Sequence, residues 1–347
     1  MEKERKLGIW EKYLTLWVAL CIAAGTLLGR FFPQISDGLA RLEVASISIP
    51  IAVCLFAMIY PIMVQISWEE IKKAALSPKP ISLTLFANWA IKPFTMAFLA
   101  WFFLSVVFGG LLSAEQIQEY RAGLILLGIA PCTAMVLVWS YLARGNMGHT
   151  LVMTAINSLT MVVLYAPLAV LLLGISGIKV PWETIALSVA IYILTPLIAG
   201  YFTRRQVINS KGREWFETRL VPLLGRISII ALLITLVVLF TYQGYLIIEL
   251  PAIIGIIAVG ILVNILVVFG VTYLAGRFMK LSYEDAAPAA IIAGSNHFEV
   301  AIAVATTLFG VTSGAALATV VGVLTEVPFM LLLVQLCKST KGFFNRD

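Results

Sequence analysis

The feature that most constrains this chain is a succession of long apolar segments with short charged or turn-forming connections between them. Ten of these segments reach the roughly 17–25 residues that a helix needs to span a bilayer. Charged residues make up only 12% of the chain, against about 25% in soluble domains. The sequence therefore predicts an all-α polytopic membrane protein with ten spans, at about 13–30, 45–66, 81–109, 121–143, 148–174, 182–203, 220–242, 250–275, 286–309 and 313–337.

The lysines and arginines in the connections predict how the chain is oriented. Eighteen of the 24 fall in the two terminal segments and in the connections on their side. Only four fall on the other side, namely Arg30, Arg41, Arg121 and Lys179. Because cytoplasmic loops carry the excess of positive charge, we expect a multi-pass protein of the cell (inner or plasma) membrane with both termini cytoplasmic. The net charge of +6 then reflects topology, and no nucleic-acid partner is expected. Residues 203–219 are expected to form the longest internal loop.

The ten predicted spans divide into two sets of five, in residues 1–174 and 182–347. Five is an odd number, so the two halves would cross the membrane in opposite orientations, as inverted repeats do. The fourth span is interrupted at Pro131 and the ninth at residues 294–297, at nearly the same distance from the start of each half. Paired interruptions of this kind indicate a transporter site near the midplane. Two unrelated kinks are the alternative.

Cys132 directly follows the proline in the fourth span. Proline is favoured at the first position of a helix, so Pro131 is expected to begin the second half-helix and Cys132 to lie in its first turn. The helix dipole there favours a thiolate, which suits soft metals and metalloids. One cysteine alone binds reversibly, as a transporter requires. Most buried cysteines are packing residues, and the chemistry alone leaves both roles open.

Glu299 lies near the middle of the ninth span, in the run Ser295-Asn296-His297-Phe298-Glu299. An ionisable side chain at membrane depth is a functional candidate by default, and a carboxyl removed from water takes up a proton more readily. If Asn296 caps the second half-helix, Glu299 takes the third position of a capping box. A capping role and a role in proton coupling or substrate binding are compatible.

Glu326 also lies at membrane depth, about 18 Å into the last span at 1.5 Å per residue. It is a second candidate for proton coupling or substrate binding. Gly314, Ala318 and Gly322 precede it at four-residue spacing. Such a face of small residues allows close helix approach, so we expect it to pack this helix against one of the broken ones.

Lys92 lies inside the third span, too deep for its ammonium group to reach the interface easily. It needs water or a partner. Water and a pairing with Glu299 or Glu326 are the alternatives, and the sequence leaves them open. Other polar residues are expected to contribute to the same site. These are Thr133 and Asn296 as substrate ligands, with Asn88, Lys92, Ser295 and His297 as accessory groups.

Several function classes lack their motifs in this chain. It has no Walker motif, dinucleotide fingerprint, Ser-His-Asp arrangement or zinc-ligand spacing. We therefore expect no cofactor, no enzymatic activity and no pumping driven by ATP. A membrane sensor or scaffold is a weak alternative, because two interrupted helices at the midplane would cost it stability without benefit.

Three segments resemble the arsenite efflux permeases of the bile acid/arsenite/riboflavin transporter superfamily. They are residues 130–145, which begin Ala-Pro-Cys-Thr-Ala-Met-Val; residues 294–305, which begin Gly-Ser-Asn-His-Phe-Glu; and residues 313–328, which end Leu-Thr-Glu-Val-Pro. Together with the ten spans, the resemblance covers nearly the whole chain. His297 departs from the family pattern, which usually has Phe there.

The resemblance implies export of arsenite, and sometimes antimonite, in exchange for protons, with no ATPase subunit required. It implies two inverted five-helix repeats, in which a core domain (81–174 and 250–337) carries the crossing helices 4 and 9 and a panel domain (13–66 and 182–242) flanks it. The family's essential cysteine, an As(III) ligand, falls on Cys132, and its membrane glutamate falls on Glu299. The nearest alternative is a sodium-coupled carrier of organic anions or bile acids, whose sodium site Thr133, Ser295, Asn296 and Glu299 would line.

Overall fold

The computed structural model describes residues 14–32, 42–44, 47–67, 78–133 and 135–344, together with residues 34 and 38. Apart from a two-stranded antiparallel hairpin of β1 (Glu43–Val44) and β2 (Ile47–Ser48), these residues form helices and short connections. The prediction of an all-α polytopic membrane protein is therefore confirmed. Six helices of the described part are long and apolar enough to cross a membrane: Pro78–Val107, Met147–Ile175, Trp182–Lys211, Arg213–Gln243, Pro251–Phe278 and Gly314–Ser339.

The other predicted spans correspond to two shorter helices and two pairs of half-helices. The fourth and ninth predicted spans are the two that are divided, as the sequence predicts. The shorter helices are α2 (Leu14–Phe31) and α4 (Ile49–Gln65), and the pairs are α8 (Ala114–Ile129) with α9 (Met135–Leu142) and α15 (Tyr283–Gly294) with α16 (Phe298–Phe309).

Three of the six long helices contain a π-helical turn directly before a proline-containing segment, and η1 (Ala87–Ile91) and η4 (Ala190–Leu194) are two of these turns. Each lies directly before a segment with proline in its second position, Pro93 or Pro196, which has no N–H to continue the regular ladder. The helix that contains η1 consists of α6 (Pro78–Phe86), η1, α7 (Lys92–Trp101) and the π-helical η2 (Phe102–Val107). The helix that contains η4 consists of α11 (Trp182–Val189), η4 and α12 (Thr195–Trp215). The other elements are η3 (Gly109–Leu111), α10 (Met147–Ile175), η5 (Phe216–Leu220), α13 (Val221–Glu249), α14 (Pro251–Phe278), α17 (Gly314–Ser339) and η6 (Lys341–Phe344).

The prediction of a loop at residues 203–219 is wrong, because α12 continues to Trp215 and η5 follows it directly. The chain bends at Gly212, whose φ of 83° is tolerated by a residue without Cβ. Beyond this bend the Arg213 Nε lies 2.6 Å from Glu217 Oε1, an i,i+4 pair that supports a helix. The polar composition of the segment reflects its exposure and not an absence of helix.

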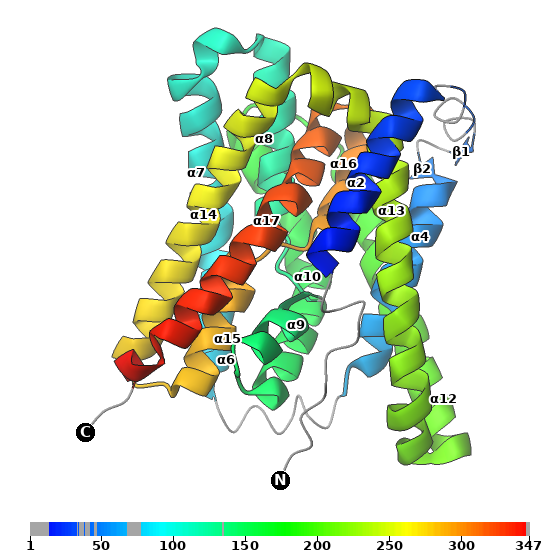
Figure 1. Ribbon diagram of the computed structural model, residues 1–347, viewed down its shortest axis with the longest axis vertical. Coiled ribbons are helices and arrows are strands. Elements are labelled where there is room, and N and C mark those ends of the chain that lie inside the picture. The colour runs from blue at the N-terminus through cyan, green and yellow to red at the C-terminus, as the bar shows by residue number, and fades with distance from the viewer. Residues whose placement is uncertain are drawn as a thin grey trace.

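Helices α2, α4, α12 and α13 pack against one another and lie side by side at the right of Figure 1. Close approach is possible because α2 has small residues where it meets α13. A Cβ atom at Gly25 would lie 2.6 Å from Val237 O, and one at Gly29 would lie 2.2 Å from Thr241 O. We call these four helices the α2–α13 group.

Helices α7, α10, α14 and α17 form a second packed set together with the four half-helices α8, α9, α15 and α16. The predicted face of small residues on α17 meets α8, which is the first half of the broken fourth span. A Cβ atom at Gly322 would lie 2.7 Å from Leu127 Cδ2, and one at Gly123 would lie 2.8 Å from the Ala318 Cβ. The expectation that this face packs against a broken helix is confirmed.

Candidate functional site

The two broken spans meet at their interruptions. Pro131, between α8 and α9, and Asn296, between α15 and α16, form an isolated antiparallel β-bridge. The His297 N–H donates to the carbonyl oxygen of Ala130 at 2.8 Å. Each interruption thus supplies partners for backbone groups of the other, which hydrocarbon could not do.

The expectation that Pro131 begins the second half-helix is wrong. Pro131 belongs to the bridge, and α9 begins only at Met135. Cys132 therefore lies in the non-helical segment that leads to α9 and not in its first turn. The reason is that the chain after α8 is extended, with Ala130 at φ −88° and ψ 104°, so that it can pair with the other interruption.

Asn296 does not cap α16, which is another correction. His297 is the N-cap, without a side-chain hydrogen bond, and Glu299 takes the second helical position. Asn296 binds Glu326 instead: its backbone N–H donates to Oε1 at 2.8 Å and its Nδ2 donates to Oε2 at 2.9 Å. Because one carboxylate accepts both donors, the last helix is joined to the break in the ninth span.

A small pocket lies beside the crossing of the two interruptions, with room for about a single water molecule. Four of the five expected substrate ligands line it, namely Cys132, Asn296, Glu299 and Glu326, while Thr133 does not. Cys132 and both glutamates are 3–4% exposed. The pocket thus combines a thiol, an amide and two carboxyl groups in an otherwise apolar environment.

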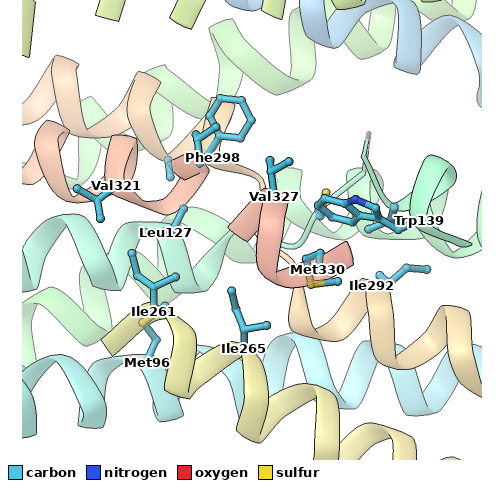
Figure 2. Close-up of a cluster of buried hydrophobic side chains, with 14 of the residues drawn as sticks. Met96, Leu127, Trp139, Ile261, Ile265, Ile292, Phe298, Val321, Val327 and Met330 are labelled. Carbon is cyan, nitrogen blue, oxygen red and sulfur yellow. The ribbon is translucent and has the colours of Figure 1, made fainter. Parts of the chain in front are cut away.

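Apolar side chains that the sequence analysis did not select complete the pocket. Figure 2 shows three of them, Trp139 of α9, Phe298 of α16 and Val327 of α17, within one buried cluster. A signal for them exists in the sequence, because residues four apart share a helix face. The remaining lining residues follow this spacing, Met135 before Trp139 and Val323 before Val327.

His297, the residue that departs from the family pattern, lies next to Glu299. Its Nδ1 is 2.8 Å from Glu299 Oε2, and both side chains are almost completely buried. The ring N–H does not point at the oxygen, so that the contact lacks hydrogen-bond geometry. The arrangement places two groups that can each carry a proton in direct contact at the edge of the pocket.

Lys92 is fully buried at the first position of α7. Its Nζ donates to Ala130 O at 3.3 Å and also to Ser295 O. The sequence left open whether Lys92 pairs with a glutamate: within the described part of the chain, no ion pair joins Lys92 to Glu299 or Glu326.

Asn88 and Thr133, two further polar candidates, do not line the pocket. Asn88 lies one turn before Lys92, and its Nδ2 donates to Asn157 Oδ1 at 3.1 Å, away from the pocket lining. Thr133 is fully buried, and its Oγ1 has no hydrogen-bond partner among the described residues. In the same part of the chain, no three His, Cys, Asp or Glu side chains are grouped closely enough to hold a metal ion. The site therefore offers one soft ligand rather than a chelating set.

The comparisons with known proteins agree with this architecture. Residues 52–250 match the model of the Sodium Bile acid symporter family. The chain is 54% identical to the uncharacterized transporter slr0944 of Synechocystis sp., over 98% of this chain and 91% of that protein. It is 43% identical to the arsenical-resistance protein Acr3 of Alkaliphilus metalliredigens, over 97% and 95%, and 34% identical to that of Corynebacterium glutamicum, over 96% and 90%.

Proposed function

Because the chain belongs to the Acr3 arsenical-resistance family within the bile acid/sodium symporter superfamily, a family of transporters and not of enzymes, we propose that it exports arsenite from the cytoplasm in exchange for protons. The observation that carries this proposal is the pocket between the two interruptions, where a thiol and two carboxyl groups meet. A thiol binds a soft metalloid, and a carboxyl group carries a proton.

Cys132 is the As(III) ligand in this proposal. Its thiol reacts with As(OH)₃ to form an S–As bond, and the thiol proton leaves with one hydroxide as water. The reverse reaction with water releases arsenite on the other side. A single S–As bond keeps this exchange reversible, as transport requires.

Asn296 and Glu326 orient the arsenic hydroxyl groups. The Asn296 amide nitrogen is committed to Glu326, so its Oδ1 faces away from the carboxylate, and no hydrogen-bond partner takes it up among the described residues. An amide oxygen is an acceptor, and a hydroxyl group of bound arsenite is a donor. We propose Thr133, fully buried beside Cys132, as a further ligand after the pocket widens.

Glu299 carries the exchanged proton, and His297 and Glu326 support it. Arsenite near neutral pH is an uncharged hydroxide, so the membrane potential does not act on it alone. Exchange for one inward proton allows the potential to contribute about 2.3 kcal/mol per 100 mV. The short distance between His297 and Glu299 supports a shared proton site at this position.

Alternating access follows from the two packed sets of helices. All residues that line the pocket come from the second set, so rocking of that set against the α2–α13 group would move the site as a unit. We propose that the sets are the core and panel domains of two inverted five-span repeats, ten spans in all, with a site that faces each side in turn.

Vesicle transport tests this function. In proteoliposomes with an imposed pH gradient, the wild-type protein should accumulate arsenite and show little response when choline replaces sodium. Cys132→Ser should reduce the rate at least about tenfold, because oxygen is a poor ligand for a soft metalloid. Cys21→Ser is the matched control, since Cys21 is half-buried in α2, and its rate should stay at the wild-type level.

Glu299→Gln separates coupling from binding. This variant should lose transport driven by the pH gradient but retain arsenite/arsenite exchange, which needs no proton. Unchanged proton-driven transport in Cys132→Ser or Glu299→Gln would remove that residue from the mechanism. Flux of an organic anion that depends on sodium, with no arsenite flux, would favour the sodium-coupled carrier for which the matching family is named.

A further inference from the structure

Lys92 contacts the ends of both broken helices at once. Ala130, whose carbonyl oxygen accepts one hydrogen bond from Nζ, is the C-cap of α8, and Ser295, whose carbonyl oxygen accepts another, is the C-cap of α15. The ammonium group thus lies where two helices end, in contact with a terminal carbonyl group of each, of which that of Ala130 also accepts from the His297 N–H. Each helix C-terminus carries a partial negative charge that favours a cation.

A position of this kind binds monovalent cations in other membrane transporters. Unwound backbone carbonyls and the C-terminal ends of half-helices are the groups that coordinate Na⁺ in broken-helix folds. A carboxylate is present as well, because Glu326 is attached to the residue after Ser295 through both donors of Asn296. Two carbonyl oxygens and a nearby carboxylate would form much of a sodium site if the ammonium group were absent.

We propose that Lys92 is a built-in cation that takes the place of a bound sodium ion between the two interruptions, and that it makes this chain independent of sodium. The ammonium group is fully buried and covalently held, so it neutralises the two helix ends without a binding equilibrium. The place of Lys92 in its helix supports this assignment. It lies between the π-helical turn η1 and Pro93, where the regular helix is interrupted.

The assignment makes a specific prediction for Lys92→Ala. Removal of the side chain leaves two carbonyl groups and the Glu326 carboxylate facing a vacant volume of cation size. An added monovalent cation should then enter it and stabilise the variant, because a ligand that binds only the folded state raises the melting temperature. The wild-type protein should not respond.

Thermal unfolding of purified protein tests this without any transport measurement. The melting temperatures of wild-type protein and Lys92→Ala are measured as NaCl replaces choline chloride at constant ionic strength. We expect a saturable rise of several degrees for Lys92→Ala and none for the wild-type protein. Lys79→Ala is the matched control, since it removes the same charge from the exposed start of α6, and it should not respond to sodium either.

A second experiment measures transport and therefore rests on the proposed function, so its result is interpreted separately from the melting temperatures. In choline, Lys92→Ala should transport arsenite at least about tenfold more slowly than the wild-type protein, and sodium should restore part of the rate. If the wild-type protein moves no arsenite, the proposed function fails, while the thermal measurement still decides the role of Lys92.

Three results would overturn the inference: sodium-specific stabilisation of the wild-type protein, a folded Lys92→Ala that sodium does not stabilise, or wild-type transport rates for this variant in choline. If Lys92→Ala does not fold, Lys92→Gln replaces it, because its amide nitrogen keeps one donor for the two carbonyl groups. Sodium should raise the melting temperature of Lys92→Gln, and no stabilisation at all counts against the inference.

Discussion

Glu326 has two structural roles at the candidate site. Its two oxygens accept from the backbone N–H and from the side-chain amide of Asn296, and it also lines the pocket. The carboxylate therefore holds the ninth-span interruption in place and faces the substrate volume at the same time. A substitution here should change stability and transport together, whereas a substitution at Cys132 should change transport alone.

Glu326→Gln should destabilise the protein by about 1–3 kcal/mol, because the new amide has one acceptor oxygen and turns a donor toward a donor of Asn296. Thermal unfolding measures this as a lower melting temperature. Glu217→Gln is the control, since it removes a carboxylate from an exposed ion pair that is worth less than about 1 kcal/mol. An equal melting temperature for Glu326→Gln and wild-type protein would show that the bond to Asn296 does not hold the interruption.

At the scale of elements, close packing of α8 on α17 supports the first interruption. Gly123 of α8 lies where its Cβ would be 2.2 Å from Ala315 O, so backbone meets backbone at this contact. Interfaces between membrane helices favour small residues for this reason. The small residues of α17 before Glu326 were predicted to have this role, but the partner helix could be identified only from the structure.

Gly123→Ala should therefore destabilise the protein by about 1–3 kcal/mol, the usual cost of forcing atoms into a well-packed interface. Gly270→Ala in α14 is the matched control. A Cβ atom there meets nothing within 4 Å, so the change should be neutral or stabilise the helix by up to about 1 kcal/mol. Melting temperatures of the two variants check this. Equal effects of the two substitutions would mean that α8 and α17 can separate at little cost.

At the scale of the whole molecule, the orientation in the membrane determines the direction of transport. The excess of Lys and Arg on one side of the predicted spans predicts that both termini are cytoplasmic. The connection between α10 and α11 contains only one such residue, Lys179, and would face outward. The proposed export requires that the pocket open first toward the positively charged side.

Reporter fusions test this orientation. Alkaline phosphatase needs disulfides that form only in oxidising compartments, so it should be active when fused after Gly177 and inactive when fused after Phe344. A fluorescent protein fused after Phe344 should give the complementary signal. Active phosphatase at the C-terminal fusion would reverse the orientation and with it the proposed direction of transport.

Local properties of the sequence were sufficient for the fold class, the approximate spans and the positions of both interruptions. Hydropathy depends on the residues within each segment, and a proline or a Gly-Ser-Asn-His run interrupts a helix wherever it occurs. The same is true of the candidate site, since Cys132, Asn296, Glu299 and Glu326 were all selected as polar or ionisable residues at membrane depth. The pairing of the two breaks brings Cys132, Asn296 and Glu299 into one pocket, whereas the place of Glu326 beside them depends on the packing of α17.

Only the tertiary structure decided which groups satisfy one another. Lys92 binds the carbonyl group of Ser295, 203 positions away, and Asn296 binds Glu326, 30 positions away. The sequence had left the partner of Lys92 open, and it had offered Asn296 a capping role that the bond to Glu326 replaces. The physical reason is that a buried polar group takes the best partner within reach in space, and distance along the chain does not reveal which one that is.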